Sequence, residues 1–191
     1  MQVLYGQDLL AVILYGSGAA GDFIPGRSNI NVALLLREVT VEQLRRALPS
    51  VTRWQGWGIV APLFLDPAYV RASTDVFPIE FLDMQENHRV LYGQDPLRDL
   101  AIDRRNLRLQ CEHEVKAKLL KLQQLYLEAG RTPRRLESLM LTSFSSFLVL
   151  IRSLLRVMGA PAPHRRDDLL AALERQLGRR PTALPSMRSM T

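Results

Sequence analysis

A glycine and a serine stand directly after a short apolar run, and this arrangement suits the binding of phosphate. Gly16 and Ser17 follow residues 11–15, AVILY, which are typical of a buried strand. Glycine lets the backbone come close to a ligand, and the serine hydroxyl offers a hydrogen-bond donor. The small residues 18–20 favour a tight turn and the start of a short helix, whose free N–H groups attract phosphate. The same residues also occur in ordinary strand–turn–helix connections that bind nothing.

Two asparagines at alternate positions mark the start of the next apolar run, residues 30–36. Side chains at positions i and i+2 of a strand point to the same face, so we expect Asn29 and Asn31 to lie together. A metal-bound phosphate at that face would be held by carboxylates. Asparagine instead offers a neutral carbonyl oxygen, which is a weaker ligand. A second interpretation is that both amides bond only the loop backbone at the start of the strand.

The stretch LYGSGAAGDFIPGRSNINVALLL resembles the nucleotidyltransferase superfamily, the fold of kanamycin nucleotidyltransferase and DNA polymerase β. The signature of that family is an apolar strand, Gly-Ser, a loop, and then Asp-x-Asp or Asp-x-Glu on the next strand. Residues 21–23, Gly-Asp-Phe, match the family's glycine–acid–aromatic step, and Ser28 matches the residue that often precedes the first aspartate. The later helices resemble the C-terminal bundle of many bacterial members.

By this resemblance, two aspartates and a third acid would hold two Mg²⁺ ions that bridge a nucleoside triphosphate and activate the acceptor hydroxyl. Eleven residues separate Ser17 from Asn29, and Asn29 and Asn31 stand at the two aspartate positions. Gly16 and Ser17 would bind the phosphates of the nucleotide. The resemblance therefore implies a kept phosphate turn beside a degenerate metal motif.

The third acid is expected on residues 76–84, VFPIEFLDM, which we predict to form a strand. Glu80 is the best candidate for this acid and for a metal ligand, and Asp83, on the opposite face, is the second choice. The pocket would then carry about one negative charge in place of three, and Mg²⁺ binding would be weakened. We expect catalysis to be lost or very weak, while a pocket of unchanged shape keeps its nucleotide.

The first half of the chain predicts short strands and helices that alternate, and the second half predicts long helices. The predicted strands are 11–15, 30–36, 57–65, 76–84 and 88–93. Two helices are predicted between them. The first, 39–48, has apolar positions Val41, Leu44 and Leu48 and ends at Pro49, and the second, 66–73, begins with Asp66 and Pro67. Such a pattern indicates an α+β fold, in which a small mixed sheet carries flanking helices.

Three amphipathic helices follow and predict an antiparallel bundle. They are expected at 96–129, as one long helix or two broken ones, at 133–158 and at 166–177. The first has an apolar stripe at spacings of three and four residues: Leu107, Cys111, Val115, Leu119, Leu122 and Tyr126. The predicted organisation is therefore a nucleotidyltransferase-like domain at 1–95, a helical bundle at 96–178, and a disordered tail at 179–191.

Composition limits the class of partner. The net charge is +6 and the pI is about 10, and only three of the 25 basic residues are lysines. An arginine-rich surface suits phosphate or nucleic acid, although codon usage explains the same bias. The single cysteine excludes a disulfide framework, no secretory signal is visible, and residues 138–151 are too short to span a bilayer. We expect a cytoplasmic protein with no membrane partner.

Arg108 and His113 reproduce the R-x-x-x-x-H pattern that resembles the HEPN ribonucleases. With so many arginines, chance produces this spacing readily. A solvated helix face, with acidic neighbours, is the simpler interpretation.

Three hypotheses about function follow from these residues. The preferred one is a nucleotide-binding or regulatory pseudoenzyme. The second is an active metal-dependent nucleotidyltransferase that moves a nucleoside monophosphate to a small molecule or a protein and uses Glu80 with one metal. The third is a non-catalytic interaction module, in which the bundle mediates homodimerisation or binds a protein partner.

Overall fold

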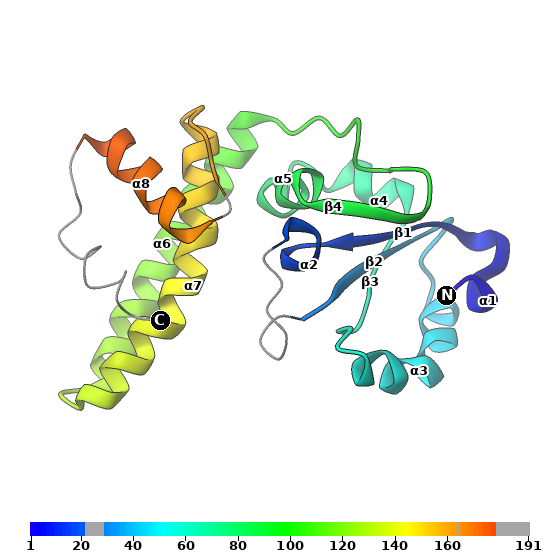
Figure 1. The fold of residues 1–191 in the computed structure, drawn as a ribbon, viewed down its shortest axis with the longest axis horizontal. Coiled ribbons are helices and arrows are strands. Elements are labelled where there is room, and N and C mark those ends of the chain that lie inside the picture. The colour runs from blue at the N-terminus through cyan, green and yellow to red at the C-terminus, as the bar shows by residue number, and fades with distance from the viewer. Residues whose placement is uncertain (22–28, 164, 179–191) are drawn as a thin grey trace. The chain divides into compact units, whose positions relative to one another are not determined.

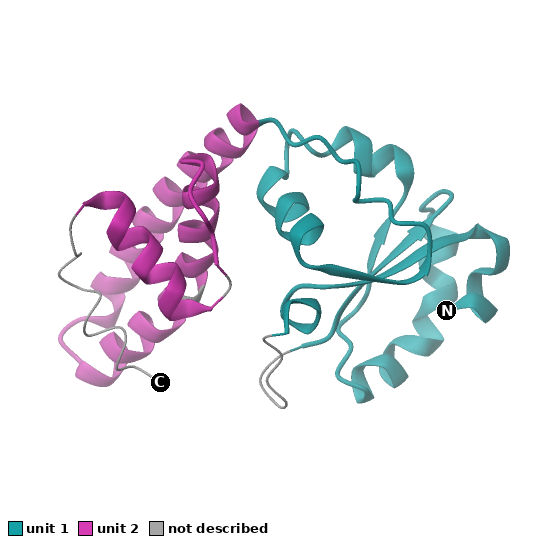
Figure 2. Ribbon diagram, turned by 45° about the horizontal axis from the view of Figure 1, so that its top comes forward, with its two compact units in different colours: residues 1–103 teal, residues 104–191 magenta. Residues whose placement is uncertain are grey.

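A computed structural model of the chain describes residues 1–21, 29–163 and 165–178. The chain divides into two compact units, Met1–Asp103 and Arg104–Thr191 (Figure 2). The predicted tail at 179–191 lies outside the described residues, as do Asp22, Phe23 and Ser28 of the family motif.

Unit 1 is built on a four-stranded mixed sheet. Its strands are β1 (Leu9–Tyr15), β2 (Asn31–Leu36), β3 (Leu63–Leu65) and β4 (His88–Gly93), in the order β3-β2-β1-β4. β1 runs antiparallel to both β2 and β4, and β3 runs parallel to β2. The predicted mixed sheet is therefore confirmed. The strand expected at 57–65 is shorter than predicted, because only an isolated bridge between Ile30 and Ile59 precedes β3.

Helices cover both faces of this sheet (Figure 1). The helices of unit 1 are α1 (Gln2–Tyr5), η1 (Gly6–Asp8), α2 (Ser17–Ala20), α3 (Val41–Gly56), α4 (Pro67–Ala72) and α5 (Pro78–Glu86). On one face, α3 packs Ala47 and Trp54 against Val12 and Leu34. On the other face, α4 and α5 pack Val70, Phe81 and Met84 against Ile13 and Leu35. The strand residues alternate between these two cores, as a sheet buried on both sides requires.

Two local predictions need correction. Residues 76–84 do not form a strand: α5 starts at Pro78, and Phe81 and Met84, three residues apart, point into the core. Proline at the first helical position is preorganised for a helix, and this outweighs the apolar character that predicted a strand. The predicted helix at 39–48 begins as expected, because Thr40 accepts a hydrogen bond from the Gln43 N–H at 3.2 Å. However, it continues through Pro49 to Gly56.

The buried face of α3 also differs from the predicted one. Val41, Leu44 and Leu48 are 67%, 40% and 65% exposed, whereas Trp54 is 5% exposed. Because the helix continues past Pro49, it includes Trp54, and the indole of Trp54 packs against the sheet. The face of α3 that carries Trp54 is therefore the buried one. The largest apolar side chain therefore decides which face of α3 is buried.

The boundary between the units lies later than residue 95, because the chain returns to the sheet after β4. Leu97 is fully buried among Ile13, Phe81 and Met84. The Gln85 side-chain N–H group lies 2.8, 3.3 and 3.1 Å from the carbonyl oxygens of Leu97, Arg98 and Leu100. The first long helix accordingly starts at Arg104 and not at residue 96.

Unit 2 consists of three helices in the part of the chain that is described: α6 (Arg104–Ala129), α7 (Pro133–Val157) and α8 (Arg166–Leu177). α6 packs along α7, and α8 packs on the C-terminal half of α7. The predicted bundle of helices is confirmed. In the predicted stripe of α6, Leu107 and Cys111 are buried, but Val115, Leu119 and Tyr126 are 42%, 51% and 60% exposed.

α7 is long and apolar enough to cross a membrane if length and composition alone are considered. This differs from the prediction from sequence, which considered only residues 138–151. A mostly buried core helix of a water-soluble protein passes the same test, but only 18% of the apolar window of α7 is buried. Phe144 of α7 packs against Leu170 of α8, and Leu155 packs against Leu169.

Candidate functional site

The Gly16 turn joins the end of β1 to α2, as the sequence predicts. Gly16 has a φ angle of 69°, which only glycine adopts without strain, and its carbonyl oxygen accepts from the Ala19 and Ala20 N–H groups at 2.9 and 3.0 Å. Its own N–H donates to the Asn87 carbonyl oxygen at 3.2 Å. The backbone of the turn is therefore fixed by hydrogen bonds to α2 and to Asn87, the residue before β4.

Asn31 lies directly over this turn. It is the first residue of β2 and pairs with Tyr15, the last residue of β1. A Cβ atom added to Gly16 would lie 3.0 Å from the Asn31 amide nitrogen, so the side chain of Asn31 occupies the space that glycine leaves free. The structure thus brings together the two motifs that the sequence separates by a loop.

Asn29 shares the face of Asn31. Ile30 between them donates its N–H to the Gly58 oxygen at 2.9 Å and accepts from the Val60 N–H at 3.2 Å, so the extended pairing continues upstream of β2. Ile30 packs with the core under α3, and its two neighbours therefore point to the opposite face of the sheet. Asn29 is exposed and Asn31 is half-buried.

The amides at this site are not used by the rest of the described fold. No residue that the structure describes forms a hydrogen bond with the side chain of Ser17, Asn29 or Asn31. The interpretation that the asparagines bond the loop backbone concerns residues 22–28, which lie outside the described residues, so the structure does not test it. Amide and hydroxyl groups beside a glycine turn are suited to a polar ligand.

The predicted third acid is not on the sheet. Glu80 lies exposed in the first turn of α5, and Asp83 lies on the same helix, where its carbonyl oxygen accepts from the Asn87 N–H at 3.0 Å. The premise that Glu80 occupies a strand beside the asparagines is therefore wrong, for the same reason that α5 was missed: Pro78 starts a helix there.

None of the four described strands contains an aspartate or a glutamate. β3, the partner of β2 on the side away from β1, consists of Leu63, Phe64 and Leu65. In the described ranges, no group of three or more histidine, cysteine, aspartate or glutamate side chains is placed to hold a metal ion. The pair of Mg²⁺ ions that the family resemblance implies does not fit these residues, because Mg²⁺ is normally held through carboxylates.

A histidine network next to the turn was not predicted from sequence. His88 Nδ1 lies 3.1 Å from the Gln85 carbonyl oxygen, and Nε2 lies 3.1 Å from an Asp95 carboxylate oxygen. Both partners are hydrogen-bond acceptors, so His88 links the end of α5 to the segment that follows β4. Local sequence gives no sign of this pair, because Asp95 reaches His88 only when the chain returns over the sheet after Gly93.

Asp95 is a stable carboxylate in this network. Burial raises the pKa of its carboxyl, but hydrogen bonds from the Leu97 N–H, at 2.9 Å, and from His88 outweigh that effect. The pKa therefore lies below its usual range. His88 follows Asn87, whose carbonyl oxygen accepts a hydrogen bond from the Gly16 N–H. The His88–Asp95 network therefore helps to fix the position of the residue that holds the turn.

The arginine–histidine pair on α6 forms part of a solvated face. Arg108 pairs with Glu112 at 3.0 Å, and His113 is 79% exposed beside Glu114. This arrangement agrees with the simpler of the two interpretations of the pattern.

Comparison with known proteins finds similar solved structures but no similar sequences. No protein-family model matches the chain, and no curated protein sequence matches it. The structure is similar to that of spectinomycin adenyltransferase AAD(9) from Enterococcus faecialis with ATP and spectinomycin, with a TM-score of 0.44 and 11% identity over 95% of this chain and 87% of that chain. At this score and identity we draw nothing from it about activity, ligands or site residues.

Proposed function

We propose that the protein is a nucleotide-binding domain of the nucleotidyltransferase type in which nucleotidyl transfer has been lost. One observation carries the proposal: asparagines stand beside an intact Gly16 turn at the expected carboxylate positions, and no described strand supplies an acid. The turn and the amides keep the shape and the hydrogen-bonding groups of a phosphate site, without the charge that a metal needs.

The chemistry favours a nucleotide without metal. A triphosphate carries several negative charges, and carboxylates a few ångströms away would repel it unless a cation lay between them. The NH₂ groups of Asn29 and Asn31 and the Ser17 hydroxyl are donors, which phosphate oxygens accept. The net charge of +6 adds a favourable long-range field.

The same residues lack what phosphoryl chemistry requires. Transfer needs an activated acceptor oxygen and neutralisation of the charge that develops on the phosphate. An asparagine amide neither takes a proton from a hydroxyl nor holds Mg²⁺ strongly. Binding without turnover is therefore the expected behaviour of this site.

Calorimetric titration with ATP, GTP, CTP and UTP, each with and without Mg²⁺, tests the proposal. We expect at least one nucleotide to bind with an affinity that Mg²⁺ changes by less than about twofold. Ser17→Ala should weaken binding about tenfold, because it removes a hydrogen bond to a charged group. Ser50→Ala, on α3 of the same unit, is the matched control and should have no effect.

The outcomes separate the three hypotheses. Binding that requires Mg²⁺, followed by release of pyrophosphate, would support an active transferase and contradict the loss of catalysis. An absence of binding by all four nucleotides would contradict a nucleotide site altogether.

A charge-restoring variant tests whether Asn29 and Asn31 occupy former metal positions. Changing both to aspartate should weaken metal-free nucleotide binding at least about tenfold through repulsion, and should make binding depend on Mg²⁺. Gln55→Glu, exposed on α3, introduces an acid elsewhere on unit 1 as the control. If the double variant binds the metal-free nucleotide as well as the parent does, the asparagines do not face the phosphates.

A second function, in protein interaction, is favoured by the exposed apolar side chains of unit 2. Leu119, Tyr126 and Leu127 on α6 are 51%, 60% and 78% exposed, and a cavity of about 460 Å³ lies between this end of α6 and the start of α7. We propose a homodimer through this surface. Sedimentation velocity should show a dimer that Leu127→Glu dissociates, and a monomer at all concentrations would overturn this second proposal.

A further inference from the structure

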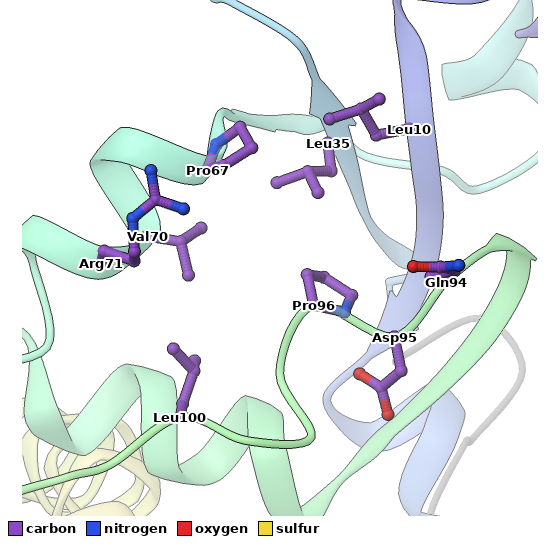
Figure 3. A pocket seen from close by; sticks show the side chains of 9 residues that line it. All are labelled: Leu10, Leu35, Pro67, Val70, Arg71, Gln94, Asp95, Pro96 and Leu100. Carbon is purple, nitrogen blue, oxygen red and sulfur yellow. The ribbon is translucent and has the colours of Figure 1, made fainter.

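Unit 1 contains a cavity that the candidate nucleotide site does not use. It has a volume of about 400 Å³ and lies between one end of the sheet, α4 and the segment that follows β4 (Figure 3). Its size falls in the range of small-molecule pockets. Its walls are mostly apolar and come from all three elements: Leu10, Leu35, Pro67, Val70, Pro96 and Leu100.

The cavity is separate from the Gly16 turn. Leu35 pairs with Ala11 near the start of β1, whereas Asn31 pairs with Tyr15 at its end. Four residues along a strand correspond to about 13 Å, so the two sites lie at opposite ends of β1 and β2. A ligand site in this cavity is therefore independent of nucleotide binding at the Gly16 turn.

One cation lies at the edge of this apolar space. Arg71 of α4 lines the cavity, is exposed, and makes no hydrogen bond or ion pair with any residue that the structure describes. Figure 3 shows Arg71 on α4, among the side chains that line the cavity. Its planar fork of N–H donors fits a carboxylate with two parallel hydrogen bonds.

The second charged group of the lining is already paired. The Asp95 carboxylate accepts from the Leu97 N–H at 2.9 Å and from His88 at 3.1 Å, and Figure 3 shows it turned away from Leu10 and Leu35. It is therefore not open to a ligand cation. Its negative charge also disfavours a dianion such as a phosphate ester in the same cavity.

We propose that this cavity binds a small monocarboxylate with an apolar body. The apolar body lies among Leu10, Leu35, Val70 and Leu100, and the carboxylate pairs with Arg71 at the rim. A single negative charge matches the single free guanidinium, and the six apolar side chains match a ligand that is otherwise uncharged.

Two isosteric probes test the proposal on the full chain: 2-naphthoate, which has the carboxylate, and 2-naphthamide, which is neutral. Ligand fluorescence and calorimetry give both affinities. We expect naphthoate to bind at least about tenfold more tightly than naphthamide, as a charge-assisted pair predicts. Arg71→Gln should remove this preference and leave the binding of naphthamide unchanged. Arg45→Gln, an exposed arginine on α3, should change neither value.

A cavity-filling variant tests the location. Leu100→Trp places an indole in the cavity and should weaken both probes at least about tenfold, and Leu10→Phe does the same from the opposite wall. Circular dichroism and a cooperative thermal transition verify that each variant is folded. Failure of naphthoate to bind at millimolar concentration, or a naphthoate affinity that Arg71→Gln leaves unchanged, would overturn the proposal.

Discussion

Gly93 gives the sharpest prediction about how unit 1 is held together. It ends β4 with a φ angle of 81°, and an added Cβ atom would lie 1.9 Å from the Leu10 carbonyl oxygen and 2.9 Å from the carbon of that group. A shift of β1 does not relieve this steric contact easily, because Leu10 belongs to β1, which pairs with β2 on its other side. We therefore expect Gly93→Ala to break the end of the β1–β4 pairing.

The magnitude has two parts. The left-handed backbone costs an alanine about 1 kcal/mol, and separating the strand ends to relieve the contact costs about 2 kcal/mol more in lost hydrogen bonds and packing. The free energy of unfolding should fall by about 3 kcal/mol, and the midpoint of thermal unfolding by more than about 10 °C.

Gly58→Ala is the matched control. Gly58 lies in the same unit with a φ angle of 76°, but the nearest atom to its added Cβ is a flexible side-chain carbon of Ile30 at 4.0 Å. This variant should lose only the backbone part, about 1 kcal/mol.

Urea unfolding followed by tryptophan fluorescence measures both variants. The two tryptophans lie in unit 1, and Trp54 is 5% exposed, so its emission reports the loss of this core. Equal destabilisation by Gly93→Ala and Gly58→Ala would refute the argument from the steric contact.

Three further predictions concern single side chains. Because the folded pKa of Asp95 is lowered, its contribution to stability is present above the unfolded pKa of about 3.9 and disappears as pH falls through the folded pKa. The difference in unfolding free energy between the parent and Asp95→Asn should therefore shrink on acidification below about pH 4. A difference that stays constant would contradict this. Burial raises the pKa of the Cys111 thiol to about 11, so alkylation by iodoacetamide at pH 8 should be far slower in the native protein than in urea, and equal rates would show that the thiol is accessible. Thr40→Ala should cost about 1 kcal/mol in urea unfolding, since it removes the cap of α3, whereas Thr40→Ser should retain most of it.

Features set by neighbouring residues were predicted from the sequence. Asp66 caps α4 through the Tyr69 N–H at 2.8 Å, and Pro67 starts the helix, as expected from these two residues alone. The Gly16 turn and its short helix were predicted for the same reason. In each case one residue type satisfies one local backbone requirement.

Features set by distant contacts were not predicted. Pro78 marks the start of α5, but the core formed by Ile13 and Leu97, which buries Phe81 and Met84, depends on distant contacts. Glu80 accordingly lies on that helix and not on the expected strand. The pairing of His88 with Asp95 depends on the return of the chain after β4, which no local pattern indicates.

The anchoring of residues 97–100 by Gln85 determines where the chain can be divided. A fragment that ends at residue 95 lacks Leu97, which is fully buried, and leaves the Gln85 amide without the three carbonyl groups it bonds. A fragment that ends at Asp103 keeps both. Limited proteolysis of the intact protein should accordingly spare the bonds between residues 94 and 100, although no helix or strand covers them.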